Sequence, residues 1–597
     1  MKLNDALAYA LLECGVDRIF GVSGANIEHF HDAIFRSHKL QSVLAKSETG
    51  AAFMADGYAR INKRMGVVCA TSGGGMTNLV SGIAESYQEG IGVLAIIGQP
   101  PQGSHGRGGF QDSSGIGHTI NAELLWQSVA KYVGALEKSE QFWPVVIEAI
   151  RSCYEKRPGP SVLLIPRDLF DQEVGSAPSN LLELIKINHP NINQALLQQV
   201  LDEIRRAQSP VLIFGLGIKL SRWQDEAIEL AHALNLPVFT TLSSKCAFPN
   251  DDPQYFGTLG VAGHPSAHDF INSQTDLILS LGTTQPLMMR GPIESGLIKN
   301  TIAVDVDIEA IERVLPLKFG IASEPGWFSK QLFALVKQTH ITRTSLPAYQ
   351  RTLVKPTVIG INDSLKPKNL SLKDCLRQSE AIALISEYLP ARSHLFFDAG
   401  NCAAAALHYL DIPHQGTATI ALGMGGMGYA VGAAIGAQIS APHKQYSCVF
   451  IGDGAFLMSG LETHTAFQYR LPVLFIVFNN HRHGMCVTRQ KIYFSGRSEA
   501  TMYNDIDISA IVSGLSQKNE CFIAQVSTAQ ELSKALKSYQ AHPERPSLIE
   551  LRLALEELPP FTPFASARPE VIPLIGSMKE SILSAIAADR AREIKNE

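Results

Sequence analysis

Two short polar motifs in the C-terminal third of the chain have the residue types and positions of a metal and phosphate site. One apolar run ends in Gly-Asp-Gly at 452–454, and the next ends in Asn-Asn at 479–480. Each motif alone is more typical of a turn, but ligands of open parallel sheets gather at the carboxyl ends of strands. Glycines let the backbone approach a diphosphate closely, and Asp453 and Asn480 offer the oxygens that Mg²⁺ prefers.

The stretch between these motifs resembles the signature of thiamine-diphosphate-dependent enzymes, in which GDG is followed, after a strand, by Asn-Asn. The intervening letters LETHTAFQYRLPV, residues 461–473, are also similar to that family. There the metal takes the Asp of GDG, the second Asn and a main-chain carbonyl two residues later. The resemblance therefore implies Mg²⁺ ligands at Asp453, Asn480 and the carbonyl of Arg482.

A glutamate near the N-terminus is the candidate activating group. Glu48 stands in AKSETGAAFMADGYAR, and in isolation it would be an ordinary helix N-terminus capped by Ser47 or Thr49. The stretch resembles the glutamate segment of the same family. That implies that Glu48 hydrogen-bonds N1' of the cofactor's pyrimidine, so that the 4'-amino group can form the carbanion at C2. Shielding from water favours the protonated carboxyl that this needs.

Other glycine-rich segments resemble the loops that hold the cofactor. TSGGGMTN at 71–78 is by itself a weak signal, and GMGGMGY at 423–429 is similar to the family's G-x-G-x-MGY. The latter implies that the Gly425 carbonyl accepts from the 4'-amino group and that Met427 wedges beneath the cofactor, although a buried methionine is usually core. The implied cofactor-binding residues are Gly24, Thr71, Asn78, Gly400, Asn401, Gly425, Met427, Gly452, Asp453, Gly454, Ala455, Asn480 and Met485.

The elements that must position these residues form three α/β blocks. At 597 residues the chain is too long for one core. Continuous apolar runs alternate with helical patterns, which predicts doubly wound parallel sheets covered on both faces. The expected domains are a pyrimidine-binding domain at 1–175, a central Rossmann-like domain at 190–340 and a diphosphate- and Mg-binding domain at 374–557, with linkers near 175–193 and 341–373 and a tail at 558–597.

Composition excludes several other classes of protein. The net charge of -5 is not concentrated in any run, which argues against a nucleic-acid or membrane-surface partner. The N-terminus is not a secretion signal, and no apolar run reaches membrane-spanning length. The nine cysteines are scattered and never form CxxC, as expected for reduced thiols in the cytoplasm.

The resemblance spans about residues 2–564 and is strongest to the acetolactate synthase-like (acetohydroxyacid synthase catalytic subunit) branch. GFQD at 109–112 is similar to the synthases' AFQE, which implies that Gln111, beside Phe110, faces the substrate. Lys131 matches a lysine of that branch, although lone lysines are usually solvated. Adjacent histidines, which would suggest a simple decarboxylase, do not occur at this place. The expected catalytic residues are thus Glu48, Gln111 and Lys131.

One departure bears on the substrate. Arg489 stands where the synthases have a tryptophan that shapes the acceptor pocket. Arginine can hold a carboxylate bidentately, so the sequence favours a carboligase that joins a pyruvate-like 2-oxo acid donor to an acceptor other than pyruvate. An Arg489 turned to solvent is the open alternative at this position. For the function, the alternatives are a non-oxidative 2-oxo acid decarboxylase or lyase, and an inactive paralogue, which would be expected to lack Glu48, Asp453 or Asn480.

The central block bears on whether a flavin is bound. The motifs of this block at 215–217 and 305–307 fit the general pattern of the domain, but the synthases' G-x-R-F-DDR segment is replaced by GTTQP at 282–286. The sequence therefore allows FAD there without favouring it. The resemblance also implies a homodimer or homotetramer with active sites at the subunit interface.

Overall fold

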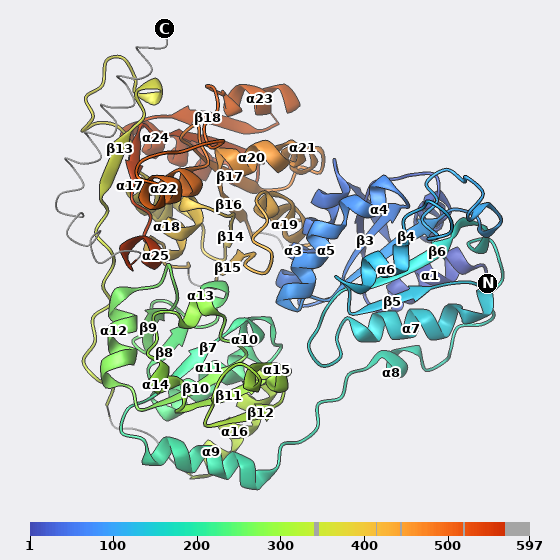
Figure 1. Ribbon diagram of the computed structural model, residues 1–597, viewed down its shortest axis with the longest axis horizontal. Coiled ribbons are helices and arrows are strands. Elements are labelled where there is room, and N and C mark those ends of the chain that lie inside the picture. The colour runs from blue at the N-terminus through green and yellow to red at the C-terminus, as the bar shows by residue number, and fades with distance from the viewer. Residues whose placement is uncertain (340–344, 414, 442–444, 517–519, 567–597) are drawn as a thin grey trace. The chain divides into compact units, whose positions relative to one another are not determined.

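The computed structural model describes residues 1–597 except 340–344, 414, 442–444, 517–519 and 567–597 (Figure 1). It contains three parallel six-stranded sheets with helices packed on them, so the predicted α/β class with three doubly wound sheets is confirmed. Among the described residues, no helix combines the length and the apolar character needed to cross a membrane. Most of the predicted tail, 558–597, lies outside the described residues.

The first sheet has the strand order β2-β1-β3-β4-β6-β5. Its three central strands are buried along their whole length, as continuous apolar runs require in a sheet covered on both faces. The strands are β1 Arg18–Gly21, β2 Gln41–Leu44, β3 Gly66–Thr71, β4 Val93–Gln99, β5 Tyr132–Ala135 and β6 Ser161–Pro166, and the main helices are α1 Leu3–Glu13, α2 Glu28–Ser37, α3 Glu48–Asn62, α5 Val80–Glu89 and α7 Phe142–Ser152.

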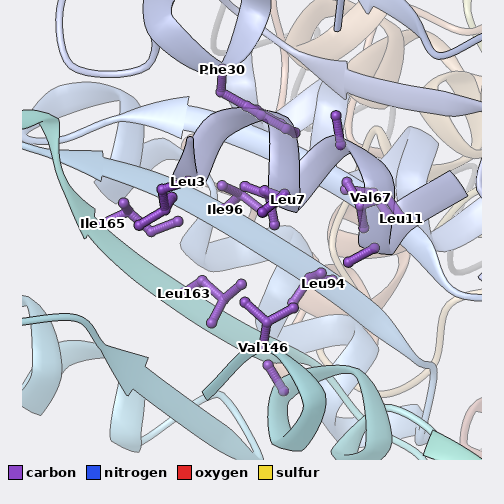
Figure 2. Packing of buried hydrophobic residues seen from close by; sticks show 14 of the residues in the cluster. Leu3, Leu7, Leu11, Phe30, Val67, Leu94, Ile96, Val146, Leu163 and Ile165 are labelled. Atoms are coloured by element: carbon purple, nitrogen blue, oxygen red, sulfur yellow. The ribbon is translucent and has the colours of Figure 1, made fainter. Parts of the chain in front are cut away.

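The core of this first domain forms on one face of the sheet (Figure 2). Leu3, Leu7 and Leu11 recur every four residues, so they share one face of α1. They pack with side chains from α2, β3, β4, β6 and α7, namely Phe30, Val67, Leu94, Ile96, Leu163, Ile165 and Val146. The apolar periodicity of the N-terminal segment therefore produces a helix that covers the sheet.

The central sheet has the order β12-β11-β10-β7-β8-β9, which is the doubly wound Rossmann arrangement. The order reverses between β7 and β10, the place where such sheets usually bind ligands. Its strands are β7 Pro210–Phe214, β8 Val238–Thr240, β9 Tyr255–Thr258, β10 Leu277–Leu281, β11 Thr301–Asp305 and β12 Phe319–Ala322, and its main helices are α9 Gln194–Arg206, α11 Gln224–Leu234, α12 Pro265–Gln274 and α16 Pro325–Thr339.

The third sheet has the order β15-β14-β16-β17-β19-β18, so β16 and β17 are neighbours. Its strands are β14 His394–Phe397, β15 Thr417–Ile420, β16 Ser447–Gly452, β17 Val473–Asn479, β18 Phe522–Val526 and β19 Ser547–Arg552. The helices include α17 Gln378–Tyr388, α18 Asn401–Tyr409, α22 Gly484–Tyr493, α23 Ile508–Leu515 and α24 Ala529–Ala541.

Part of the stretch predicted as the second linker is a strand. β13 Val358–Ile361 pairs antiparallel with β20 Leu555–Glu557. Four residues without clear alternation give no reliable sequence signal. The strand forms because its backbone pairs with a segment far along the chain.

The contacts divide the chain into two units: Met1–Asn188 with Ala421–Ser447 and Ser459–Val473, and His189–Ile420 with Cys448–Met458 and Leu474–Glu597. Segment 421–447 thus groups with the first sheet by its contacts. Its helix α19 Tyr429–Gln438 packs on α3 through small residues. A Cβ on Gly57 would lie 2.1 Å from the Ala433 carbonyl oxygen, and one on Gly436 would lie 1.9 Å from that of Met54. These glycines permit the close approach of the two helices.

Candidate cofactor and active site

The structure brings the two residues predicted to bind the metal together at the carboxyl ends of β16 and β17. Asp453, the first residue of α20 Asp453–Ser459, is 2% exposed. Its Oδ1 accepts from the Gly454 amide at 2.9 Å and its Oδ2 from the Asn480 amide at 3.1 Å. Burial raises the pKa of Asp453 to about 6, although hydrogen bonds oppose the shift. A buried carboxylate with this cost of ionisation fits a bound cation, which would offset the lost hydration.

The first asparagine of the pair fixes the turn. Asn479 Nδ2 donates to Glu550 Oε1 at 2.6 Å and to the Ile506 carbonyl at 3.2 Å, while its Oδ1 accepts from the His481 amide at 3.2 Å. Glu550 is fully buried on β19, and His481 has φ +56°, a costly conformation that this network holds in place. Asn479 therefore shapes the turn that presents Asn480.

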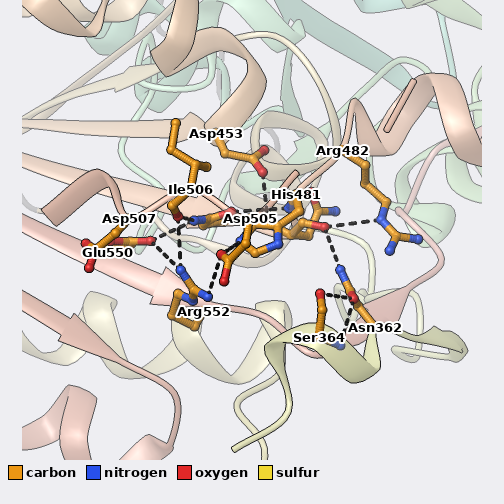
Figure 3. Close-up of polar contacts among 12 residues, drawn as sticks. Asn362, Ser364, Asp453, His481, Arg482, Asp505, Ile506, Asp507, Glu550 and Arg552 are labelled. Atoms are coloured by element: carbon orange, nitrogen blue, oxygen red, sulfur yellow. Dashed lines mark hydrogen bonds and ion pairs between the residues drawn. The ribbon is translucent and has the colours of Figure 1, made fainter. Parts of the chain in front are cut away.

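The Asn480 carbonyl accepts hydrogen bonds from Asn362 and Arg482, two side chains labelled in Figure 3. Asn362 Nδ2 donates to it at 3.0 Å and Arg482 Nε at 3.1 Å, while the Arg482 guanidinium also pairs with Glu556. The Arg482 side chain is therefore engaged by the protein, and the predicted metal contact needs its carbonyl only. Asn362 lies in the predicted linker, and no sequence motif singled it out.

The ligand set expected for Mg²⁺ contains one carboxylate, one amide and one carbonyl. Accordingly, within the described part of the chain no group of three or more His, Cys, Asp or Glu side chains could hold a metal ion. Asp453 accepts from the Asn480 amide, and Arg482 lies two residues further along the same turn, so the donor set fits the predicted ion.

The predicted diphosphate residues surround this turn. Gly400, at φ +106°, precedes α18, and the Oδ1 of Asn401 is buried without a hydrogen-bond partner among the described residues. A Cβ on Gly484 would lie 3.0 Å from the Nδ2 atoms of both Asn401 and Asn480. A small cavity beside this turn is lined by polar, apolar and acidic residues, namely Gln378, Asn401, Asn480, Gly484, Val487, Thr488, Leu553, Leu555, Glu556 and Glu557. A buried amide oxygen without a partner and a cradle of amides fit a polar ligand.

Space around the glycine motif is equally restricted. A Cβ on Gly454 would lie 2.5 Å from Nδ1 of His483, so only glycine fits there. Gly452 ends β16, and Ala455 is 1% exposed in the first turn of α20. Met485 is the second residue of α22 and is half-buried.

Glu48 and the loop that follows β3 form a second cluster, in the first unit. Glu48 opens α3, and the Ser47 hydroxyl caps this helix by accepting from the Gly50 amide at 3.0 Å. Asn78 Nδ2 donates to Glu48 Oε2 at 3.0 Å. A Cβ on Gly75 would lie 3.2 Å from Glu48 Oε1. The cap expected from the sequence and the predicted catalytic carboxylate thus occur together, with one carboxylate oxygen fixed by Asn78.

The predicted catalytic Gln111 is held in a strained conformation at the end of β3. It has φ +60°, and its Oε1 accepts from the Thr71 hydroxyl at 3.0 Å and from Asn26 Nδ2 at 3.4 Å. A Cβ on Gly24 would lie 2.6 Å from Thr71 Cγ2. The structure therefore gathers Gly24, Thr71 and Gln111. Asn26, which is 4% exposed, belongs to no motif that the sequence offered. The signal that could have pointed to it is its place in the loop that follows β1.

The segment with Gly425 and Met427 is an open loop before α19. Gly425 has φ +64°, and a Cβ there would have no heavy atom within 4 Å. Met427 is half-buried, not part of a closed core. Both observations suit a loop that faces a ligand.

Lys131 has a different environment from the one expected of a catalytic residue. Its ammonium donates to the carbonyls of Ser152 at 2.8 Å, Arg157 at 3.0 Å and Glu155. These carbonyls lie at and beyond the end of α7, where a cation is favourable. Lys131 also precedes β5, at the amino end of the strands, whereas Gln111 lies at the carboxyl end. Its contacts describe a structural role, and they lend no support to the catalytic prediction.

The two predicted substrate-pocket residues are exposed. Phe110 is 78% exposed, and Arg489 lies on an exposed face of α22. The solvent-facing alternative for Arg489 therefore stays open.

The crevice of the central sheet is closed. At its switch point, the Gly217 amide donates to the Gly282 carbonyl at 2.8 Å, and a Cβ on Gly215 would lie 2.2 Å from the same oxygen. Here glycines permit packing of loop on loop at the place where such sheets usually bind a diphosphate. This packing lends no support to a dinucleotide such as FAD, and the expectation about FAD stays a prediction.

Comparison with known proteins identifies the family of the chain. Residues 1–117, 197–332 and 398–551 match the N-terminal TPP binding, central and C-terminal TPP binding domains of the thiamine pyrophosphate enzyme family. The chain belongs to this family of thiamine-diphosphate enzymes.

The chain is similar to acetolactate synthase large subunits. That of Lactococcus lactis is 28% identical over 508 residues, 83% of each chain. The probable large subunit of Methanocaldococcus jannaschii is 27% identical over 581 residues, 94% of each chain. In fold, it resembles a thiamine diphosphate-dependent 4-hydroxybenzoylformate decarboxylase from Rhodococcus jostii RHA1, with a TM-score of 0.77, 22% identity and coverage of 93% of this chain and 100% of that one.

Proposed function

We propose that the protein is a thiamine-diphosphate- and Mg²⁺-dependent carboligase that decarboxylates a pyruvate-like 2-oxo acid and joins the acyl unit to a second carbonyl compound. The observation that carries the proposal is the contact between buried Asp453 and the Asn480 amide at adjacent strand ends. The similarity to acetolactate synthase large subunits supports carboligation over simple decarboxylation.

Bound thiamine diphosphate would supply a nucleophilic carbon for the 2-oxo acid and an electron sink for the electrons left by carbon dioxide. Asp453, Asn480 and the Arg482 carbonyl would hold the Mg²⁺ that carries the diphosphate. Glu48 would share a proton with N1' of the pyrimidine, with Asn78 orienting the carboxyl group. Gln111 would face the substrate, kept in place by Thr71.

A Glu48→Gln substitution tests the activating role. We expect turnover to fall by at least about 100-fold because the amide cannot share a carboxyl proton with N1'. Cofactor affinity, measured by isothermal titration calorimetry, should change little. Turnover near the wild-type rate would remove Glu48 from the mechanism.

The acceptor is proposed to be larger or more anionic than pyruvate. Arg489 supports this choice, since a guanidinium on the exposed face of α22 can bind a carboxylate bidentately. The test is mass analysis of products from pyruvate and other 2-oxo acids, each with and without carbonyl acceptors. We expect carbon–carbon bonded products from acceptors other than pyruvate. Acetolactate as the sole efficient product would contradict the acceptor, and aldehyde released equally with or without acceptor would indicate a decarboxylase.

We also propose that two copies of the chain form the minimal active enzyme. In the proposed dimer a partner would cover exposed apolar side chains of the first unit, among them Leu44, Phe110, Ile116, Ile120, Leu124, Met424 and Leu461. Analytical ultracentrifugation should show a dimer or tetramer, and specific activity should fall on dilution below its dissociation constant. A fully active monomer would refute this arrangement.

No flavin is proposed for the central domain, because the loops after β7 and β10 pack against each other. Titration of the purified protein with FAD should leave flavin fluorescence unchanged. Saturable quenching would show that the crevice opens.

A further inference from the structure

A buried group of charged side chains lies beneath the loop that contains Gly425 and Met427. At its centre, Arg60 on α3 pairs with Asp56, Nε to Oδ1 at 2.6 Å, and with Glu89 on α5, Nη1 to Oε2 at 2.6 Å. The side chains of Arg60 and Asp56 are fully buried. One turn before Glu89 on the same helix, Glu85 is 1% exposed.

Glu85 anchors the beginning of the loop. Its Oε1 accepts from the Gly423 amide at 2.9 Å and its Oε2 from the Met424 amide at 2.6 Å. A Cβ on Gly423 would lie 2.6 Å from Gln88 Cβ and 3.0 Å from Glu85 Oε1, so only glycine lets the backbone reach the carboxylate. Each carboxylate oxygen therefore serves one amide donor.

The same charged group anchors the end of the loop. The Tyr429 hydroxyl donates to Asp56 Oδ1 at 2.5 Å, and the Ser86 hydroxyl donates to Asp56 Oδ2 at 2.8 Å. Tyr429 is 1% exposed and is the first residue of α19. Glu89, the partner of Arg60, accepts from the Leu422 amide at 3.3 Å, next to the two amides that Glu85 binds. The charged group around Arg60 therefore contacts both ends of the exposed loop.

We propose that Glu85 is a positioning residue for the cofactor: by fixing the backbone at Gly423 and Met424, it sets where the Gly425 carbonyl and Met427 meet the aminopyrimidine ring. The inference rests on the proposed function, because it assigns the loop to thiamine diphosphate. Glu85 touches neither substrate nor cofactor in this role. It acts through the backbone that it holds.

A carboxylate is the group that this role requires. Two convergent backbone donors need two acceptor oxygens, which a glutamate side chain supplies. A glutamine of the same shape offers one oxygen and turns an NH₂ group toward the other donor. One buried amide is then left unpaired, which frees the loop to adopt other conformations.

The test combines amide exchange with cofactor binding in the full-length protein. In Glu85→Gln, hydrogen–deuterium exchange of peptides covering 421–428 should become faster without cofactor, and thiamine diphosphate with Mg²⁺ should bind about tenfold more weakly by calorimetry. Gly423→Ala should do the same from the loop side, because it displaces the backbone from the carboxylate. Glu140→Gln, at an exposed glutamate of the same domain, is the matched control and should change neither value.

The outcomes separate this inference from the proposed function. Faster exchange together with weaker binding in both variants would support the positioning role. Unchanged binding in Glu85→Gln would overturn it, whether or not exchange changes. If the wild-type protein itself binds no thiamine diphosphate, the proposed function fails first, and the failure appears in the wild type and not only in the variants.

Discussion

The central and third domains have the same kind of α/β sheet but differ at the ends of their strands. Both are six-stranded parallel sheets with glycine-containing turns after adjacent strands. After β16 and β17 the turns present Asp453 and Asn480, whereas after β7 and β10 Gly215 and Gly282 pack against each other. A parallel sheet therefore provides a place for a site, and the side chains at the strand ends decide whether a site exists.

The largest effect on the site of the third domain is expected from removing its buried carboxylate. Asp453→Asn should lower Mg²⁺ affinity and turnover by at least about 100-fold, since it takes away the only charged ligand of the predicted set. Calorimetry with Mg²⁺ and thiamine diphosphate measures the first, and product formation the second. Asp251→Asn, at an exposed position of the central domain, is the control and should be silent. Unaltered metal affinity in Asp453→Asn would disprove the metal site.

A substitution at the strand ends of the central sheet should lower stability and leave cofactor affinity unchanged. Gly215→Ala places a Cβ 2.2 Å from the Gly282 carbonyl oxygen, so the loops must separate. We expect the free energy of unfolding to fall by about 1–3 kcal/mol, as for other overpacked sites, while cofactor affinity stays at the wild-type value. Urea denaturation and calorimetry check the two results. Loss of cofactor binding by the folded variant would mean that the central crevice does contribute to the site.

Lys131 lies at the amino end of the strands of the first sheet, opposite the edge where Gln111 lies. Lys131→Met removes donors to three carbonyls and should lower the free energy of unfolding by about 1 kcal/mol with little change in kcat. Lys39→Met, at another exposed lysine, should leave stability unchanged. A large loss of kcat at unchanged stability would instead restore the catalytic assignment of Lys131.

The smallest expected effect concerns pH. Burial raises the pKa of Glu85 to about 7, with Glu89 adding to the shift and Arg60 opposing it. The folded protein therefore binds more protons here than the unfolded chain between pH 4.5 and 7, so this group's contribution to stability falls as pH rises through that window. Relative to Glu85→Gln, the wild-type protein should lose unfolding free energy between pH 5 and 8. Parallel stability profiles for the two proteins would contradict the shifted pKa.

Much of the fold and of the site could be predicted from the sequence because the relevant signals are local. Long apolar runs between helical patterns specified parallel strands, and the Gly-Asp-Gly and Asn-Asn motifs directly follow such runs. The carboxyl ends of neighbouring parallel strands must meet at one edge, so Asp453 and Asn480 could be placed together without knowing any pairing register. The cap of α3 by Ser47 is equally local.

Other features depended on contacts between residues far apart in sequence. Asn362, Asn26 and Glu85 stand in no motif, and each acts by reaching a backbone or side chain that only folding brings near. β13 forms by pairing with β20, and Lys131 is engaged by carbonyls beyond α7. Which strand ends carry chemically useful side chains can be read from consecutive residues of the sequence. Which partners hold those side chains depends on the tertiary structure, since a hydrogen bond between distant segments produces no periodic pattern in the sequence.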